Sequence, residues 1–437
     1  MTQWSAMSST AVRRAAATPR ALVTAALATA LLLAGCSGGS GEQGPGNPTH
    51  STSPSQAQTP AETVDPDTPT GWGPTEGELS RARDLVAAMA VPEQASTVLM
   101  PGFWGYDGLD PTPAEAAQNR VMHGVDSAAQ ALDAHAFGGV FLRPEVIADA
   151  DQVDRLTGVL HDVGDQPDGL PLLISIDQEG GVVQRLKVGV DVVPSAASVG
   201  AAGDPAYATK VARENGRTLR RLGVTMVMAP VADVDPDGSS VMGSRTYSPD
   251  TKVAAAMVTA TVQGYLDAGI IPAVKHFPGL GTVTGDSHHS LPEQDKTLAQ
   301  LRRTDLVTFE AAIKAGAPVV MTGHVAVDAI EPGMPASISK GVVQGLLRDT
   351  LGFRGVAVTD SQGMGPINGP YNSGEGAVRS LLAGDDLVLN SPYPGRARRA
   401  VQRAVREGRL PAERLAEAAT RVLALRIYQQ RISSSAG

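Results

Sequence analysis

The sequence predicts an α/β fold, a single (β/α)8 barrel of the TIM type. Eight short apolar runs alternate with helical stretches after residue 75. Each run is nearly continuous, as expected for strands that are buried on both faces of a parallel sheet. Eight β/α repeats in about 360 residues are typical of this barrel. A doubly wound open sheet is the alternative, although no dinucleotide-binding glycine motif follows the first run.

The predicted strands lie, in chain order, in "STVLMPGF", "AFGGVFL", "LPLLISID", "VTMVMAPVADV", "IPAVKHF", "APVVMTGHV", "GVAVTD" and "DDLVLN". The clearest predicted helices span residues 207–222, 252–268, 298–315 and 342–351. A glycine follows each of them, as at helix C-termini, namely Gly223, Gly269, Gly316 and Gly352. A final helix over residues 411–430 nearly ends the chain, so we expect no second folded domain after the barrel.

Residues 1–35 have the layout of a signal peptide. Arginines precede the apolar run "ALVTAALATALLLAG", which is shorter than the ~20 residues that a membrane span needs. The run leads into "LAGC", which resembles a bacterial lipobox and implies that Cys36 is lipidated and begins the mature protein. An ordinary secretory signal with a chance cysteine is the alternative. We therefore expect a lipid-anchored protein on the extracytoplasmic face of the cell membrane.

Composition separates a linker from a folded domain. Residues 36–73 are rich in Ser, Gly, Thr, Pro, Gln and Asp and nearly lack large apolar side chains, which predicts a flexible tether. The catalytic domain is expected over residues 74–437. The formal net charge of −9 and the aromatic content of 4% argue against a nucleic-acid binder. The only cysteine leaves none for a disulfide or a thiolate metal site.

Polar side chains follow the predicted strands at their carboxyl ends, where barrel enzymes hold their active sites. They are Asp177 with Arg185, Asp233 and Asp235 with Arg245, Lys275 with His276, His324, Asp360 and Asn390. The loop "KHFPGLGTVTGDSHHSLP" adds Asp286, His288 and His289, whose spacing is not that of the common zinc motifs. There is no nucleophilic serine elbow or catalytic cysteine. Carboxylates flanked by cationic donors indicate glycoside cleavage.

Several stretches resemble glycoside hydrolase family 3, in its NagZ-type branch of β-N-acetylglucosaminidases. They are "SIDQEGGVVQRL", "MAPVADVD", "GSRTYS", "AVKHFPGLGTVTGDSHHSLP", "VMTGHV", "PASIS" and "GFRGVAVTDSQGM", which together cover nearly the whole barrel. The resemblance implies that Asp360 is the nucleophile, that His288 is the general acid/base and that Asp286 orients it. It also implies that the sugar hydroxyls and N-acetyl group are held by Asp177, Arg185, Arg245, Lys275 and His276.

The same resemblance implies the reaction. It would be retaining release of terminal N-acetylglucosamine (GlcNAc) from β-1,4-linked GlcNAc–N-acetylmuramic acid (MurNAc) fragments of peptidoglycan, by a monomer without metal or organic cofactor. A β-glucosidase, a GlcNAc phosphorylase of the same fold and a sugar-binding lipoprotein without turnover are the alternatives. Leu280 departs from the family, which usually has His there, and His289 competes with His288, although the spacing from Asp286 favours His288.

Overall fold

The computed structural model describes residues 64–165, 169–238 and 240–436. All of them belong to one compact unit, Glu62–Gly437. The predicted signal peptide, the predicted lipidation site Cys36 and most of the predicted tether lie outside the described residues.

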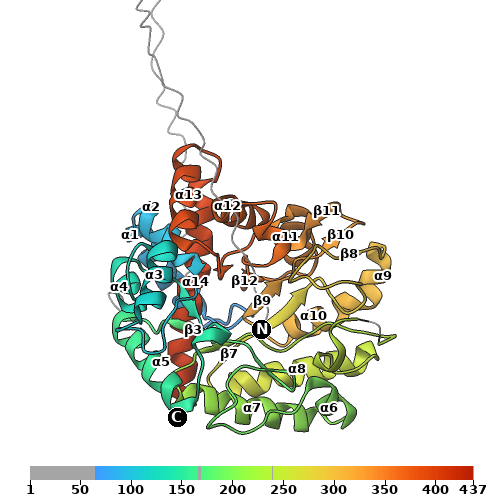
Figure 1. The fold of residues 1–437 in the computed structure, drawn as a ribbon. Coiled ribbons are helices and arrows are strands. Elements are labelled where there is room, and N and C mark those ends of the chain that lie inside the picture. Colours follow the sequence, from blue (N-terminus) through green and yellow to red (C-terminus); the bar gives the residue numbers. More distant parts are fainter. Residues whose placement is uncertain (1–63, 166–168, 239, 437) are drawn as a thin grey trace, which may run out of the picture. The chain divides into compact units, whose positions relative to one another are not determined.

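A curled parallel sheet forms the centre of this unit (Figure 1). Six parallel strands follow one another in the order β12-β9-β7-β6-β3-β2. Their bounds are Gly139–Phe141 for β2, Leu173–Ile176 for β3, Met226–Val227 for β6, Ile271–Phe277 for β7, Val319–Thr322 for β9 and Val356–Thr359 for β12. All of their residues are buried, which explains why the strands read as continuous apolar runs.

A second parallel pair, β1 (Leu99–Met100) and β13 (Val388–Leu389), extends this arrangement. The Gly138 N–H donates to the Leu99 carbonyl over 3.1 Å, and the Thr359 N–H donates to the Leu387 carbonyl over 3.0 Å. The pair is thus hydrogen-bonded next to both β2 and β12, the two edges of the six-stranded sheet. Each of the eight predicted runs holds one strand, and the predicted α/β class is confirmed.

Helices cover the outside of the sheet (Figure 1). Those nearest to the predictions are α7 (Pro205–Arg221), α8 (Thr251–Asp267) and α14 (Ala412–Ser435). The glycines predicted to end helices have positive φ angles of 69° at Gly223, 75° at Gly269, 83° at Gly316 and 71° at Gly352. This is the left-handed conformation that glycine adopts without steric strain.

Two predicted helices differ in detail. The expected helix over residues 298–315 is divided at Thr304 into α9 (Leu298–Arg303) and α10 (Asp305–Lys314). The Thr304 hydroxyl bonds to the carboxylate of Asp305, and Lys296 pairs with the same carboxylate over 2.6 Å. The segment Gly341–Thr350 forms a wide π-type helix. The regular helices were predicted from the spacing of apolar residues, and that spacing carries no information about such side-chain contacts.

The folded part begins earlier than predicted. The sequence predicts a tether up to residue 73, yet Trp72 is only 4% exposed and belongs to the core. A Cβ atom on Gly73 would lie 2.5 Å from the ring of Tyr428, and the Gly73 carbonyl accepts a bond of 2.9 Å from Arg431. One tryptophan and contacts with α14 order a segment whose composition is that of a linker.

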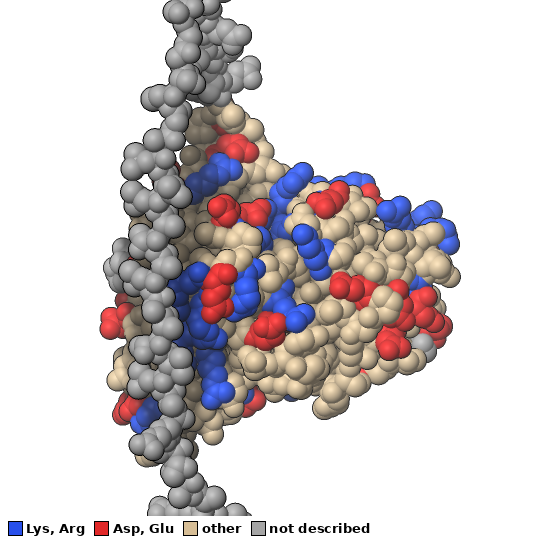
Figure 2. Space-filling view, turned by 90° about the horizontal axis from the view of Figure 1, so that it is seen from above, with Lys and Arg blue, Asp and Glu red and all other residues tan. Residues whose placement is uncertain are grey.

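The surface carries both signs of charge. Helix α13 (Pro394–Arg406) lies at the top of Figure 1, and its exposed arginines are Arg396, Arg399, Arg403 and Arg406. Figure 2 shows Lys and Arg side chains gathered on the face seen from above. None of the helices in the described part of the chain combines the length and apolarity that a membrane crossing requires.

Candidate active site

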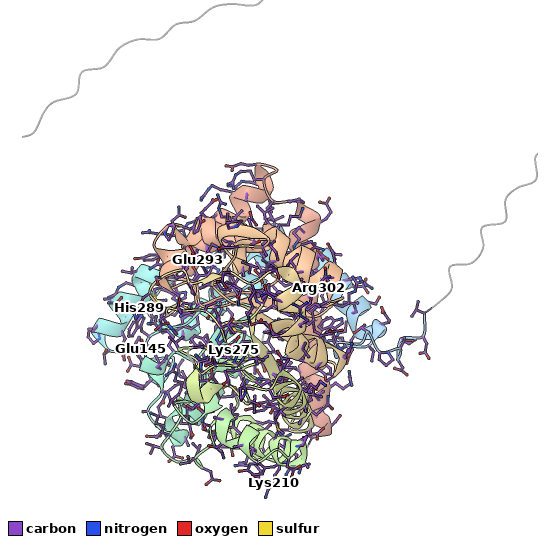
Figure 3. All side chains as sticks on the ribbon, turned by 90° about the vertical axis from the view of Figure 1, so that its right-hand side faces the viewer. Glu145, Lys210, Lys275, His289, Glu293 and Arg302 are labelled. Atoms are coloured by element: carbon purple, nitrogen blue, oxygen red, sulfur yellow. The ribbon has the colours of Figure 1, made fainter. Side chains whose placement is uncertain are left out.

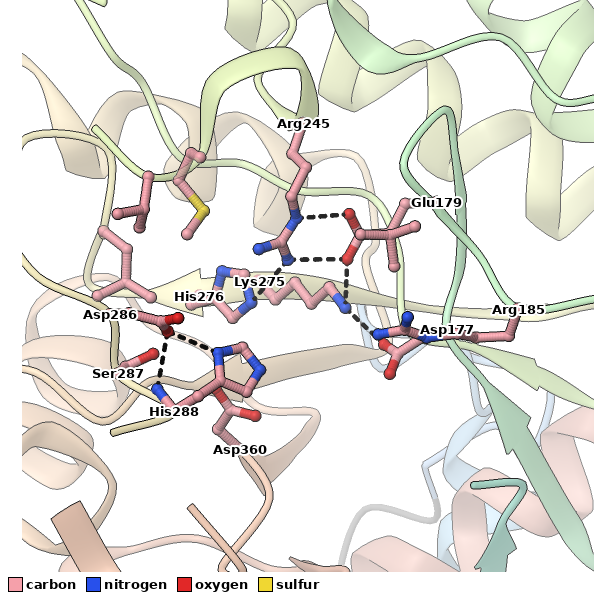
Figure 4. Close-up of a pocket in the computed structure, with 14 residues that line it drawn as sticks. Asp177, Glu179, Arg185, Arg245, Lys275, His276, Asp286, Ser287, His288 and Asp360 are labelled. Carbon is pink, nitrogen blue, oxygen red and sulfur yellow. Dashed lines mark hydrogen bonds and ion pairs between the residues drawn. The ribbon is translucent and has the colours of Figure 1, made fainter. Parts of the chain in front are cut away.

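A polar pocket of about 150 Å³ lies at the carboxyl ends of β3, β7 and β12 (Figure 4). All eight catalytic and sugar-binding residues predicted within the barrel line it, namely Asp177, Arg185, Arg245, Lys275, His276, Asp286, His288 and Asp360. These residues lie together because the carboxyl ends of parallel strands meet at one end of a curled sheet. The other lining residues are Glu179, Val183, Val241, Met242, Leu280 and Ser287.

Glu179 pairs with two cations of the pocket, Lys275 and Arg245. The sequence did not identify it as a site residue. Its carboxylate accepts bonds of 2.8 Å and 2.9 Å from Arg245 and lies 2.7 Å from Lys275 Nζ. Lys275 Nζ also donates to Asp177 over 2.8 Å. The cations therefore have fixed positions from which they can donate to sugar hydroxyls.

The electrostatics of this cluster favour full ionisation. Burial raises the pKa of Glu179, but the charges of Lys275 and Arg245 outweigh that effect and bring the pKa to about 2. Burial lowers the pKa of Lys275, yet Asp177 and Glu179 raise it above its ordinary value. Each charge is buried with an opposite partner, as buried ions require.

A tight hairpin places Glu179 in the pocket. Strands β4 (Gln178–Gly180) and β5 (Val183–Gln184) pair in an antiparallel manner directly after β3. Gly180 has a φ angle of 95°, and a Cβ atom there would lie 2.3 Å from the Pro194 carbonyl oxygen. The signal in the sequence was the pair of acids around Gln178 followed by two glycines, in "DQEGG".

Asp233, which follows β6, organises the neighbouring wall. Its Oδ2 lies 2.7 Å from Nδ1 of His276, and its Oδ1 accepts a bond of 2.7 Å from the Leu280 N–H. The other ring nitrogen of His276 lies 3.4 Å from Arg245. Asp233 thus orients the His276 ring and fixes the start of the loop that carries Asp286 and His288.

Asp286 and His288 form a pair on that loop. Asp286 Oδ1 lies 2.7 Å from His288 Nδ1 and also accepts the His288 backbone N–H over 2.9 Å. This backbone bond is the main reason that the pKa of Asp286 lies below its ordinary value. His289 is 4.0 Å from the other carboxylate oxygen, and its side chain is 84% exposed. The geometry therefore pairs Asp286 with His288 rather than with His289.

Asp360 directly follows β12, is partly buried, and lies beneath the His288 ring in Figure 4. Burial raises its pKa, but His324, His276, the Ser361 N–H and Lys275 outweigh that effect and lower it. Lys275 contributes, whereas Arg185 is not among these groups and lies beside Asp177.

His324 supports the segment around Asp360. It is fully buried, and its ring nitrogens lie 2.8 Å from the Ser337 hydroxyl and 2.9 Å from the Ser361 carbonyl. Burial lowers its pKa. His324 does not line the pocket, and it contacts the backbone of Ser361, the residue after Asp360.

The pocket combines a partly buried carboxylate, Asp360, with a more exposed imidazole–carboxylate pair and with cations held by ion pairs. A carboxylate can attack an electrophilic carbon, and an imidazole can exchange a proton near neutral pH. Within the described ranges, no group of three or more His, Cys, Asp and Glu side chains is placed to hold a metal ion.

Comparison with known proteins identifies the family. The family described as "Glycosyl hydrolase family 3 N terminal domain" matches residues 117–425. The chain belongs to glycoside hydrolase family 3. This family 3 enzyme is therefore a glycoside hydrolase, as predicted. It is 38% identical to a beta-hexosaminidase of Xylella fastidiosa over 265 residues, which are 59% of this chain and 77% of the relative.

Solved structures agree with the family. A glycoside hydrolase family 3 β-N-acetylglucosaminidase from Paenibacillus sp. aligns with a TM-score of 0.71 and 37% identity, over 80% of this chain and 64% of that one. LpqI of M. tuberculosis aligns with a TM-score of 0.66 and 30% identity, over 78% of this chain and 95% of that one. Both similarities extend over most of the described unit.

Proposed function

We propose that this family 3 enzyme is a retaining exo-β-N-acetylglucosaminidase that releases terminal GlcNAc from β-1,4-linked GlcNAc–MurNAc fragments of peptidoglycan. The observation that carries the proposal is the pairing of Asp286 with His288 in the pocket that Asp360 also lines. The names of the beta-hexosaminidase relatives and of the β-N-acetylglucosaminidase structures support this specificity.

In the first step, Asp360 attacks the anomeric carbon while His288 protonates the oxygen of the departing sugar. The lowered pKa of Asp360 keeps the attacking carboxylate ionised at neutral pH. A His288 ring that donates from Nδ1 to Asp286 has Nε2 available for the catalytic proton.

In the second step, His288 takes a proton from water, and the resulting hydroxide cleaves the ester between Asp360 and GlcNAc. Two displacements at the same carbon retain its configuration. Retaining glycosidases usually employ two carboxylates, so a histidine as acid/base departs from that pattern. The charge of Asp286 compensates by stabilising the protonated ring.

The remaining polar groups of the pocket would hold the GlcNAc ring. Asp177 accepts bonds from sugar hydroxyls, and Lys275, Arg245 and His276 donate to hydroxyl and acetamido oxygens. Arg185 lies beside Asp177 and extends this surface (Figure 4). The small size of the pocket, about 150 Å³, supports the proposed action on one terminal sugar.

The decisive experiment compares the aryl β-N-acetylglucosaminide with the aryl β-glucoside, with and without added phosphate. The wild-type enzyme should strongly prefer the N-acetyl sugar and need no phosphate, and Asp360→Asn should lose turnover while keeping the melting temperature. Equal rates on both sugars, or an active Asp360→Asn, would overturn the proposal. Dependence on phosphate would instead indicate a phosphorylase.

We also propose that the enzyme is anchored through a lipid on Cys36 at the extracytoplasmic face of the cell membrane, where peptidoglycan fragments occur. This rests on the "LAGC" sequence and the apolar run before it. Fractionation of cells that express the wild type and Cys36→Ala tests it. Recovery of both proteins in the same membrane fraction would exclude the lipid anchor.

A further inference from the structure

Beside Asp360, away from the GlcNAc pocket, the loops that follow β1, β2 and β13 form a second polar corner. Its members are Trp104, Arg143, Glu145 and Asn390, none of which lines the pocket. Trp104 follows β1, Arg143 and Glu145 follow β2, and Asn390 follows β13. All of these loops leave the carboxyl ends of parallel strands, the end at which the pocket opens.

Arg143 is held in one position. Its guanidinium carbon lies 4.4 Å from the centre of the Trp104 ring, and its Nε and Nη2 face the carboxylate of Glu145 at 3.3 Å and 3.4 Å. Both ion-pair distances are long, and no acceptor for Nη1 is found among the described residues. A guanidinium that is held against an aromatic ring is preorganised to bind an anion, because binding then costs little further conformational entropy.

Buried polar groups hold the supporting loop. Asn119 is fully buried, and its amide exchanges two bonds of 2.9 Å with the backbone N–H and carbonyl of Trp104. His123, whose pKa burial lowers to about 4, lies 3.0 Å from the Gly102 carbonyl. A Cβ atom on Gly102 would lie 2.5 Å from Arg143 Cδ and 3.1 Å from Asn390 Oδ1. Glycine at this position allows Arg143 and Asn390 to approach each other.

This corner is physically continuous with the nucleophile. Asn390 Nδ2 donates to the Ser361 hydroxyl over 3.0 Å, and the Ser361 N–H donates to Asp360 over 2.7 Å. Asn390 has a φ angle of 46°, the one positive value for a residue other than glycine in the described part of the chain. Strained backbone of this kind persists where the surroundings fix it, and it is frequent at ligand sites.

On its other side, the corner lies near Arg185, which lines the pocket. Burial raises the pKa of Glu145, but its hydrogen bond to Arg143 and the charges of Arg143 and Arg185 bring the pKa below its ordinary value. Glu145 is therefore ionised and is paired with Arg143, and Arg185 adds a second positive charge nearby. Figure 3 shows Glu145 at the same margin of the molecule as His289, the neighbour of the paired His288.

We propose that this corner binds the leaving-group sugar of the substrate and that Arg143 selects a leaving group with a carboxylate. The inference rests on the proposed exo-hydrolysis, because the departing sugar must extend from the anomeric carbon next to Asp360. Trp104 and Asn390 position Arg143 and the surface around it. The carboxylate would pair with the free edge of the guanidinium, as carboxylates do with arginine.

The test uses the full chain and three substrates: GlcNAc-β-1,4-MurNAc, the neutral disaccharide GlcNAc-β-1,4-GlcNAc, and the aryl β-N-acetylglucosaminide. The wild type should prefer the acidic disaccharide. In Arg143→Gln the ratio of kcat/KM for the acidic over the neutral disaccharide should fall about 10- to 100-fold, as for loss of a hydrogen-bonded charge pair. Arg143→Lys, which retains charge without the planar fork, should give an intermediate ratio.

Arg409→Gln is the matched control, because it removes a guanidinium that pairs with an exposed carboxylate, Glu407, away from the corner. It should keep the wild-type ratio. A ratio in Arg143→Gln within about twofold of wild type, with an unchanged melting temperature, would overturn the inference. A wild type that fails to cleave even the aryl N-acetylglucosaminide would instead overturn the proposed function, so the two failures are distinguishable.

Discussion

His288 Nδ1 lies 2.7 Å from Asp286 Oδ1, and the two residues belong to the same short turn. The His288 backbone N–H donates to the same oxygen over 2.9 Å, so one carboxylate fixes both the ring and the main chain. The side chains of His288 and Asp286 remain 62% and 45% exposed, whereas Asp360 is only partly exposed. The proposed proton donor is thus more exposed than the proposed nucleophile.

This relationship predicts how His288→Ala should behave. Hydrolysis of GlcNAc–MurNAc should fall by about 10²- to 10⁴-fold, because its leaving oxygen needs a proton. The loss for an activated aryl glycoside should be clearly smaller, since that leaving group departs without one. Steady-state kinetics on both substrates measure the difference.

His289→Ala provides the control, because its side chain is 84% exposed and lies outside the pocket lining. It should retain wild-type kinetics. Equal losses on both substrates in His288→Ala would remove His288 from the acid role, and a large loss in His289→Ala would transfer that role to its neighbour.

Glu179→Gln should destabilise the domain. The substitution leaves Lys275 and Arg245 buried without their shared counter-charge, which predicts a loss of roughly 3 kcal/mol in the free energy of unfolding at pH 7. Urea unfolding measures it. The exposed pair Glu310–Lys314 supplies the comparison, and Glu310→Gln should change stability by less than about 0.5 kcal/mol.

The lowered pKa of Glu179 also predicts how the stability of the domain depends on pH. The pKa of Glu179 falls from 4.5 to about 2 on folding, so its contribution is complete above pH 4.5 and is lost as the pH falls toward 2. The wild type should therefore lose more stability than Glu179→Gln between pH 5 and pH 3, values chosen to fall roughly within that window. Parallel losses in both proteins would contradict this assignment.

Leu280→His should lower stability without raising activity. Leu280 is 2% exposed, and its loop is held through its backbone N–H by Asp233, so the side chain is not needed for that contact. Burying an imidazole there should cost about 1–3 kcal/mol. Thermal unfolding and kcat/KM on the aryl N-acetylglucosaminide are the measurements. A more active Leu280→His of wild-type stability would show that the side chain governs the loop.

Asp233→Asn should reduce kcat/KM by about 10- to 100-fold, because the His276 ring and the Leu280 N–H lose a charged acceptor. Asp235→Asn, in the same segment after β6, should have a smaller effect, because Asp235 accepts a bond from the Ser240 N–H and not from His276. If the two variants lose activity equally, the effect would be a general disturbance of the loop rather than the orientation of His276.

Strand positions and one side of the site could be predicted from the sequence. The eight apolar runs all hold strands because burial on both faces of a sheet demands apolar residues at every position. Strand ends then identified Asp177, Lys275, His276 and Asp360, since parallel strands present their carboxyl ends together. The family resemblance added Asp286 and His288 on a loop that no periodicity places.

Only the tertiary structure determined which charged side chains pair with each other. Glu179 became the shared partner of Lys275 and Arg245 only because a hairpin turns back after β3, and Asp233 contacts Leu280 across 47 positions of the chain. Trp72 belongs to the core, and the next residue, Gly73, packs against Tyr428 in a helix at the opposite end of the sequence. Local sequence determines burial and strand ends through the polarity of successive residues. Pairing of charges depends on distances that arise only after distant segments have packed together.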